Sequence, residues 1–354
     1  MTKMTPDQID KALKAGIIDA SQAKDMMAKL DVNAPKPDQA ALIGDEENMR
    51  FVRSFSDVFI ATGIGLLSMG LYASVGIFGA IVKVEWVGYL VGAGLIWLMC
   101  EYFGRIKRAH LPTLLLALAY LLFVHKGVSN LLDFSAQLAV VAGIVPAVIT
   151  ILAMLLFYWR FKLPFSVALI AISLVILVFA LLGGTIPTGI LLLLSGLALF
   201  GTALSYDARD TDRKTRFADN AFWLHFTAAP LIIHGFAIQV LTPEVIKIGG
   251  VIPMVQLGKA DAAFMLLTIG LLALVGLAIN RRALLVSSLG YAGFAIGFLI
   301  KDTGLNLGSV VALTLLILGG GIVFLGVGWH GARKALLKVL PTSGFMAKIF
   351  PPSG

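Results

Sequence analysis

The sequence predicts an all-α membrane protein: a bundle of about ten transmembrane helices, with both termini in the cytoplasm and a small cytoplasmic helical hairpin. The chain has 354 residues, of which 58% are hydrophobic and 14% are charged, whereas soluble domains contain about 45–50% apolar and about 25% charged residues. Its mean hydropathy of +0.92 leaves too little polar surface to cover a soluble globule. Long apolar runs also recur along the chain, with Lys and Arg clustered between them.

The apolar runs define the predicted spans. A helix needs about 20 mainly apolar residues to cross hydrocarbon that is about 30 Å thick. Each run is expected to be helical, because lipid cannot satisfy an open backbone. The ten predicted spans cover approximately residues 55–78, 85–104, 111–128, 137–158, 164–183, 186–205, 221–241, 261–279, 283–301 and 308–329.

The distribution of basic residues predicts the orientation of these spans. If the N-terminus is cytoplasmic, the outer segments hold five of the 28 Lys and Arg residues, and every arginine falls on the cytoplasmic side. Positively charged loops remain in the cytoplasm, and an error of one span would destroy this asymmetry. We therefore predict a multi-pass protein of the cell membrane, a bacterial inner membrane, with both termini cytoplasmic.

Several classes of protein are excluded or disfavoured. The net charge of +8 lies in short clusters between apolar runs, which argues against a nucleic-acid partner. Cys100 is the only cysteine, so a disulfide scaffold is excluded. There is no H-E-x-x-H, Walker motif, nucleophile elbow or Cys/His cluster. We expect no metal and no cofactor, and the sequence argues against an enzyme.

The polar ends of the chain predict its domain organisation: a hairpin (1–31), a linker (32–50), the transmembrane domain (51–330) and a basic amphipathic tail (331–354). Two helix starts share one spacing, at 5–8 and 19–22, and Gly16 ends the first helix. Two helices of about ten residues cannot bury a core alone. The hairpin therefore needs a partner for its apolar seam.

The segment from Ile9 to Leu30 resembles the short helical hairpins, including the SHOCT type, at the termini of many bacterial membrane proteins. The whole chain resembles uncharacterised bacterial families that place such a hairpin before many spans. This resemblance implies a cytoplasmic interaction module and no chemistry. The expected partners are the lipid bilayer and, through residues 5–30, a cytoplasmic protein or a second copy of the chain.

Polar groups inside a span are costly, so they are the first candidates for a functional site. The seventh span contains Trp223, His225 and His234, together with Pro230 as a candidate hinge. A polar cavity here could relay protons or bind substrate. The alternative is that each histidine bonds a loop or a neighbouring helix. Their spacing of nine residues turns about 900°, which puts them on opposite faces of the helix.

Two acidic features carry weaker hypotheses. Glu101 lies four residues before Arg105, which predicts a local ion pair; the alternative is a proton-coupling carboxylate, and Glu101 joins the candidate relay residues. The loop 206–216 contains Asp207, Asp210 and Asp212 among four basic residues. We expect a solvated loop there and no cation site.

The last span and the tail supply the remaining candidates. Gly319, Gly320 and Gly321 lie in the middle of the last span and are candidate hinge residues. A separate basic helix is expected over 332–340. Its candidate contacts with lipid headgroups are Arg333, Lys334 and Lys338.

Two functions remain open from the sequence. The first is a structural or regulatory membrane protein whose hairpin docks a cytoplasmic partner. The second is a transporter of a small apolar or weakly charged solute with a polar site at the seventh span, since ten spans can divide into two inverted halves. The segment 242–260 between spans seven and eight is expected to be either an extracellular turn or a re-entrant segment.

Overall fold

The computed structural model describes residues 6–33, 55–82, 84–132, 139–211, 213, 215–240, 245–248, 252–255, 259–341, 343–344 and 346–350. The chain divides into two compact units, with the boundary between Asn48 and Met49. Thr5 and residues 34–50 of the predicted linker lie outside the described residues.

The first unit contains α1 (Pro6–Lys14) and α2 (Ala20–Asn33). Helix α1 ends at Gly16, whose φ of +70° is a conformation that glycine adopts without strain. The amide of Ile17 donates to the carbonyl of Ala12 at 3.0 Å, and the amide of Gly16 donates to that of Leu13 at 3.1 Å. These two bonds form a Schellman motif, so the predicted stop at Gly16 is confirmed.

Helix α2 starts with a capping box. The amide of Gln22 donates to Asp19 Oδ1 at 2.8 Å, and the amide of Asp19 donates to Gln22 Oε1 at 3.0 Å. The Ser21 hydroxyl also donates to Asp19 Oδ1, at 2.7 Å. The helix start predicted at residues 19–22 is therefore present, and two amides that have no partner inside the helix are satisfied.

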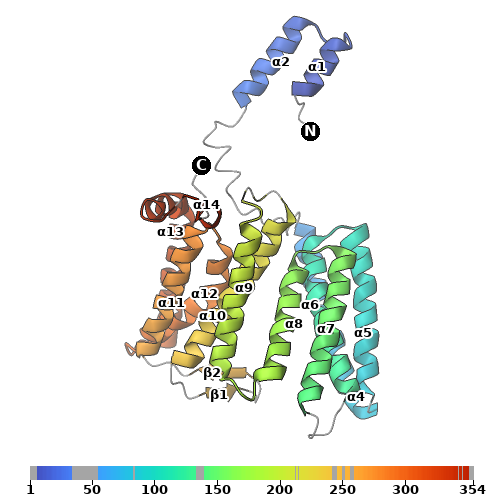
Figure 1. The fold of residues 1–354 in the computed structure, drawn as a ribbon, viewed down its shortest axis with the longest axis vertical. Coiled ribbons are helices and arrows are strands. Elements are labelled where there is room, and N and C mark those ends of the chain that lie inside the picture. Colours follow the sequence, from blue (N-terminus) through green and yellow to red (C-terminus); the bar gives the residue numbers. More distant parts are fainter. Residues whose placement is uncertain are drawn as a thin grey trace. The chain divides into compact units, whose positions relative to one another are not determined.

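The second unit contains ten helices that are long and apolar enough to cross a membrane, within the residues that the structure describes (Figure 1). The predicted number of spans is confirmed there. The ten are α4 (Phe55–Val82), α5 (Glu85–Cys100) with its π-helical continuation η1 (Glu101–Ile106), α6 (His110–Leu131), α7 (Ala139–Phe161), α8 (Phe165–Leu182), α9 (Thr188–Asp207), α10 (Arg216–Val240), α11 (Lys259–Ala278), α12 (Ala283–Lys301) and α13 (Leu307–Leu337).

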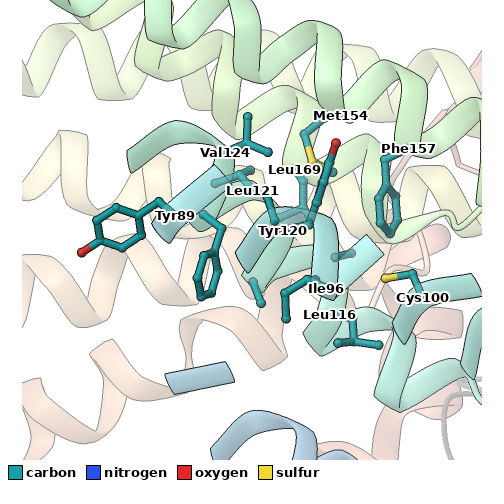
Figure 2. Packing of buried hydrophobic residues seen from close by; sticks show 14 of the residues in the cluster. Tyr89, Ile96, Cys100, Leu116, Tyr120, Leu121, Val124, Met154, Phe157 and Leu169 are labelled. Atoms are coloured by element: carbon teal, nitrogen blue, oxygen red, sulfur yellow. The ribbon is translucent and has the colours of Figure 1, made fainter. Parts of the chain in front are cut away.

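The described residues of the bundle form two large hydrophobic cores and two smaller buried clusters. The first surrounds α6, which packs against α4, α5, α7 and α8, and it includes Tyr120, Phe157 and Leu169 (Figure 2). The second surrounds α10, which packs against α9, α11 and α12. Helices α6 and α10 have 61% of their most apolar window buried, against at most 33% in the other spans. Contacts between α8 and α10 join the two cores.

Helices α9 and α10 approach each other more closely than large side chains would allow. Small residues recur every seventh position on both helices, at Gly189, Gly196 and Ala203 on α9 and at Ala221, Ala228 and Gly235 on α10, and all six are buried. A Cβ added to Gly235 would lie 2.4 Å from the amide nitrogen of Leu193. The pair therefore packs backbone against backbone, as small residues permit in membrane helices.

Helix α13 differs from the prediction. We expected a span ending near residue 329 and a separate basic helix over 332–340, but a single helix runs from Leu307 to Leu337. No proline interrupts this stretch, and its 31 residues extend for about 46 Å, which exceeds the thickness of the hydrocarbon. Arg333 and Lys334 therefore lie on the last turns of the final span, and Lys338 follows directly after its end. A short helix, α14 (Met346–Ile349), follows.

The segment between α10 and α11 contains two short strands, β1 (Val245–Ile248) and β2 (Ile252–Val255). They pair antiparallel, with Val245 opposite Val255 and Ile248 opposite Ile252. A two-stranded sheet leaves edge amides and carbonyls unpaired, and hydrocarbon cannot satisfy them. This geometry favours an ordered turn over a re-entrant segment.

Four turns at one end of the bundle share a backbone feature. They connect α5 to α6 through η1, α7 to α8, α9 to α10 and α11 to α12, and we call this the basic end. Each contains one residue other than glycine with a positive φ: Arg108, Lys162, Arg213 and Asn280, at 52° to 57°. Such residues are uncommon and carry a steric cost. The turns are therefore defined, tight connections.

Candidate functional site

A group of buried charged side chains lies at the basic end, where α9, α10 and the α11–α12 turn meet. Asp207 is the last residue of α9, and Arg281 lies in the turn after α11. Arg281 Nε lies 3.1 Å and 3.2 Å from the two carboxylate oxygens of Asp207, and its Nη2 donates to Asp207 Oδ1 as well. The side chains of Arg281 and Asp207 are 2% and 12% exposed.

His225 joins this pair from α10. Its Nε2 lies 2.8 Å from Asp207 Oδ2, and its side chain is fully buried. A carboxylate only accepts hydrogen bonds, so Nε2 carries the proton and donates it. The neighbour on one side of the imidazole is the ring of Phe200, at 5.3 Å between centroids. A neutral His225 satisfies this geometry, and the charges of Asp207 and Arg281 then cancel.

The turn that carries Arg281 is itself held at three points. Asn280 occupies the left-handed position of a Schellman motif, in which the amide of Arg281 donates to the carbonyl of Gly276 at 2.7 Å. The Asn280 side chain accepts from Trp329 Nε1 of α13 at 2.8 Å. Arg213 Nη2, from the α9–α10 turn, donates to the carbonyl of Ile279 at 3.0 Å.

Chemically, this arrangement is a set of ionic and hydrogen bonds that joins helix ends and includes the imidazole of His225. Arginine stays protonated in proteins, so Arg281 needs the carboxylate of Asp207 to offset its burial. Three elements that are distant in sequence share that one carboxylate. Protonation of His225 would add a positive charge to a buried group that is otherwise neutral.

The seventh span contributes only one of its two histidines to this site. His234 lies nine residues further along α10 and faces Tyr291 of α12, at 6.2 Å between ring centroids. This placement agrees with the predicted opposite faces. Trp223 is buried against Phe165, at 4.5 Å between centroids, and Pro230 lies inside α10, which continues through it.

Glu101 belongs to a separate ion group on α5, η1 and α7. Its Oε2 accepts from Arg105 Nη1 at 3.3 Å, so the predicted pair at i,i+4 is confirmed. It also accepts from Arg160 Nη2 at 2.8 Å, a contact that the sequence did not indicate. The π-helical turn η1 begins at Glu101, and both arginines come from the basic end.

The candidate hinge and headgroup residues on and just after α13 do not join the Asp207–His225–Arg281 group. The helix runs without interruption through Gly319, Gly320 and Gly321, and a Cβ at any of the three would meet no atom within 4 Å. Arg333 is 1% exposed, so its side chain is enclosed by protein and is poorly placed for a lipid headgroup. Lys334 and Lys338 are exposed.

Sequence reasoning missed most of this site. The loop that contains Asp207 and Asp210 was expected to be solvated, but both residues are largely buried. Asp210 Oδ2 accepts from the amide of Thr215 at 2.8 Å, just before α10 begins. The sequence did show charged residues, Asp207 and Arg281, directly after two predicted spans, where a charge is close to the membrane interior, but it did not show that the two meet.

Searches with family models, among curated proteins and among solved structures each found no match. The class of protein therefore follows from the fold alone. Ten long apolar helices with lipid-compatible exteriors, such as Phe324 (76% exposed) and Val327 (85% exposed), define a multi-pass α-helical membrane protein. In the part of the chain that the structure describes, no group of three or more His, Cys, Asp or Glu residues could hold a metal ion.

Proposed function

We propose that this chain is a structural or regulatory protein of the cell membrane, the inner membrane of a bacterium, which docks a cytoplasmic partner through α1 and α2. The observation that carries this proposal is the exposure of apolar side chains on a pair of helices that is too small to fold alone. Ile9 and Ala23 are buried between them, but Ile17 is 75% exposed and Leu13 is 36% exposed. Water-exposed apolar residues on a small unit favour association with another surface.

The proposed orientation places both termini and the basic end in the cytoplasm. It is supported by the placement of the arginines within the described residues, since all nine in the second unit belong to the basic end. They are Arg105, Arg108, Arg160, Arg209, Arg213, Arg216, Arg281, Arg282 and Arg333. Basic loops are retained on the cytoplasmic side of a membrane.

Site-specific photo-crosslinking in cells tests the docking. A crosslinker at Leu13 of the full chain should give a discrete adduct, and Ile17→Asp should abolish it while Lys14→Asp, an exposed polar control, should not. Deletion of residues 1–31 should leave the bundle inserted. No adduct at Leu13, or loss of insertion after the deletion, would contradict the proposal.

A transporter is the second candidate, and the buried Asp207–His225–Arg281 group favours it because an intramembrane ion group can couple to protons. Two observations weigh against it. Glu101 contacts Arg160 of α7 and His234 contacts Tyr291 of α12, whereas a Cβ at Gly319, Gly320 or Gly321 would meet no atom within 4 Å, so these candidates do not line one site. The central helix is also third in the first half of the bundle (α6) but second in the second half (α10), which is not the arrangement of a simple inverted repeat.

His225→Gln separates the two candidates. Glutamine can still donate a hydrogen bond to Asp207, but it cannot carry a proton at physiological pH. The docking proposal expects this variant to behave like the wild type in cells, whereas His225→Leu should lower the melting temperature. If His225→Gln abolished a cellular phenotype of the protein while its stability was unchanged, the transporter would be favoured.

A further inference from the structure

Two basic residues of the second half of the bundle are enclosed by protein, although others there, such as Arg209 and Arg216, are exposed, and no basic residue described in the first half is buried. In the second half, Arg281 and Arg333 are 2% and 1% exposed, so their guanidinium groups are enclosed by protein. In the first half, the cations stay at the surface: Arg105 is 51% exposed, and Lys107, Arg108 and Lys162 are also exposed. Retention of positive loops on one side of a membrane explains why both sets lie at one end. It does not explain this difference in exposure.

Five cations of the first half lie on two neighbouring turns at the basic end. Glu101 accepts from Arg105 of η1 and from Arg160 of α7, so it ties together the two turns that carry the patch. A Cβ on Gly104 would lie 3.6 Å from Phe161, which confirms that η1 packs against the end of α7. The segments 100–110 and 158–166 contain five cations and one carboxylate. We call Arg105, Lys107, Arg108, Arg160 and Lys162 the basic patch.

Aromatic rings hold the lysines of the basic patch in place. Lys107 Nζ lies 5.8 Å from the centroid of the Tyr102 ring, and Lys162 Nζ lies 5.6 Å from that of Tyr158. Arg108 and Lys162 occupy left-handed backbone positions in their tight turns. Stacking and backbone geometry restrict these long side chains before a ligand arrives, so less conformational entropy is lost on binding.

The surface next to the basic patch is apolar. Trp159 is 67% exposed, Ile106 is 72% exposed and Leu156 is 51% exposed. Tryptophan is characteristic of the membrane interface, and the aliphatic side chains belong at the level of acyl chains. A ligand that fits both surfaces has an anionic head joined to an apolar tail. A soluble anion such as a free phosphate would use only the cations.

We propose that the basic patch binds the headgroup of an anionic phospholipid, whose acyl chains lie against Trp159, Ile106 and Leu156. The inference does not depend on the docking role of α1 and α2, nor on which compartment the basic end faces, because the ends of spans lie at headgroup level on either side. It also moves the expected headgroup contact away from Arg333, which is buried.

Native mass spectrometry of the full chain in detergent tests this proposal. The protein is titrated with phosphatidylglycerol, with phosphatidylcholine and with glycerol phosphate, which has no tails. We expect phosphatidylglycerol to bind more tightly than phosphatidylcholine, and glycerol phosphate not to compete. Each cation removed should weaken phosphatidylglycerol binding about fivefold, so the triple variant K107Q/R108Q/K162Q should bind about a hundredfold more weakly.

The control variant R209Q/R216Q/K338Q removes three exposed cations from the same end of the bundle and should bind phosphatidylglycerol like the wild type. Equal losses in both triple variants would show a non-specific effect of charge and overturn the proposal. Effective competition by glycerol phosphate would identify a soluble anion as the ligand and overturn it as well. If the first triple variant is not monodisperse, K107Q and K162Q are measured singly, and wild-type affinity in both would overturn the proposal.

Discussion

Asp207 shows how a single residue can hold distant segments together. Its carboxylate is shared by His225 of α10 and Arg281 of the α11–α12 turn, and all three are largely buried. A buried arginine without its carboxylate is strongly unfavourable, because the charge can neither return to water nor be neutralised. The group therefore holds these helix ends together, and its loss should destabilise the whole second core.

Substitution of Asp207 alone should lower the stability of the protein far more than substitution of Asp207 and Arg281 together. Asp207→Asn removes the carboxylate that pairs with the buried Arg281 and should destabilise the protein by about 3–5 kcal/mol. The double variant Asp207→Asn with Arg281→Met should recover more than half of that loss. Thermal unfolding in detergent measures both, and Arg209→Gln is an exposed control that should not change the melting temperature. A double variant no more stable than Asp207→Asn would contradict this account.

Asp19 gives α2 a dependence on pH. Hydrogen bonds from the Ser21 hydroxyl and the Gln22 amide hold the pKa of this carboxyl below its usual range. A depressed pKa in the folded state means that the stabilisation is present above the unfolded value of about 3.9 and is lost as the pH falls through the folded value. The cap should therefore be intact at neutral pH and should weaken only in acid.

Hydrogen exchange of the full chain checks this expectation. Peptides that cover residues 19–33, corrected for the intrinsic exchange rate, should keep their protection down to about pH 4 and lose part of it below. In Ser21→Ala, which removes the largest contribution to the shift, the loss on acidification should be smaller. Protection that instead decreases as the pH rises toward neutrality would contradict the expected loss of the Asp19 cap in acid.

Individual residues were only partly predictable from the sequence. The ion pair of Glu101 with Arg105 and the capping box of Asp19 are local, at spacings of four and three residues, and both patterns can be read directly. The contact of Asp207 with Arg281 joins residues 74 positions apart. Nothing in a single sequence without a repeat or motif indicates which helix ends will meet, so this part of the site was missed.

At the scale of elements, glycines allow α9 and α10 to pack backbone against backbone. Gly196 and Gly235 each face the backbone of the partner helix. A Cβ added to Gly196 would lie 2.9 Å from the amide nitrogen of Ile232, and one added to Gly235 would lie 2.4 Å from that of Leu193. No rearrangement of a flexible side chain can relieve a contact with backbone. The tight packing brings Asp207 and His225 within hydrogen-bonding distance.

Gly235→Ala should therefore force the two helices apart. We expect a loss of about 1–3 kcal/mol, as for an overpacked core, and a weaker contact between Asp207 and His225. Gly201→Ala is the matched control on α9, since a Cβ there would meet no atom within 4 Å. It should be neutral or stabilising by up to about 1 kcal/mol, because alanine favours the helix.

Thermal unfolding of the two variants in parallel measures this difference. Equal melting temperatures for Gly235→Ala and Gly201→Ala would contradict the close packing of α9 and α10.

Elements were predicted better than their ends. Hydrophobic length predicted all ten spans, because lipid imposes nearly the same requirement on every helix. The predicted end of the last span was wrong. Helix α13 continues from Trp329 to Leu337, because this stretch contains no helix-breaking proline. The strands β1 and β2 were not predicted, because their short apolar segments carry no clear alternation of polar and apolar residues.

The whole molecule combines a small polar unit with a bundle that has two cores. The described arginines of the bundle lie at one end. In the second half, Arg281 and Arg333 are enclosed by protein, whereas Arg105 and Arg160 beside Glu101 in the first half are 51% and 30% exposed. Its orientation in the membrane determines which compartment meets α1, α2 and the basic patch. The central claim is therefore that ten spans cross the bilayer with the basic end in the cytoplasm.

Cysteine accessibility in intact cells tests that claim most directly. Cys100, which is buried, is replaced by Ala, and single cysteines are placed at Thr185, Thr211 or Thr303, which are exposed. A membrane-impermeant maleimide should label the variants at Thr185 and Thr303 from outside, and should label the variant at Thr211 only after the membrane is opened. Labelling at Thr211 in intact cells, or protection at Thr185 and Thr303, would contradict the topology and every functional assignment that depends on it.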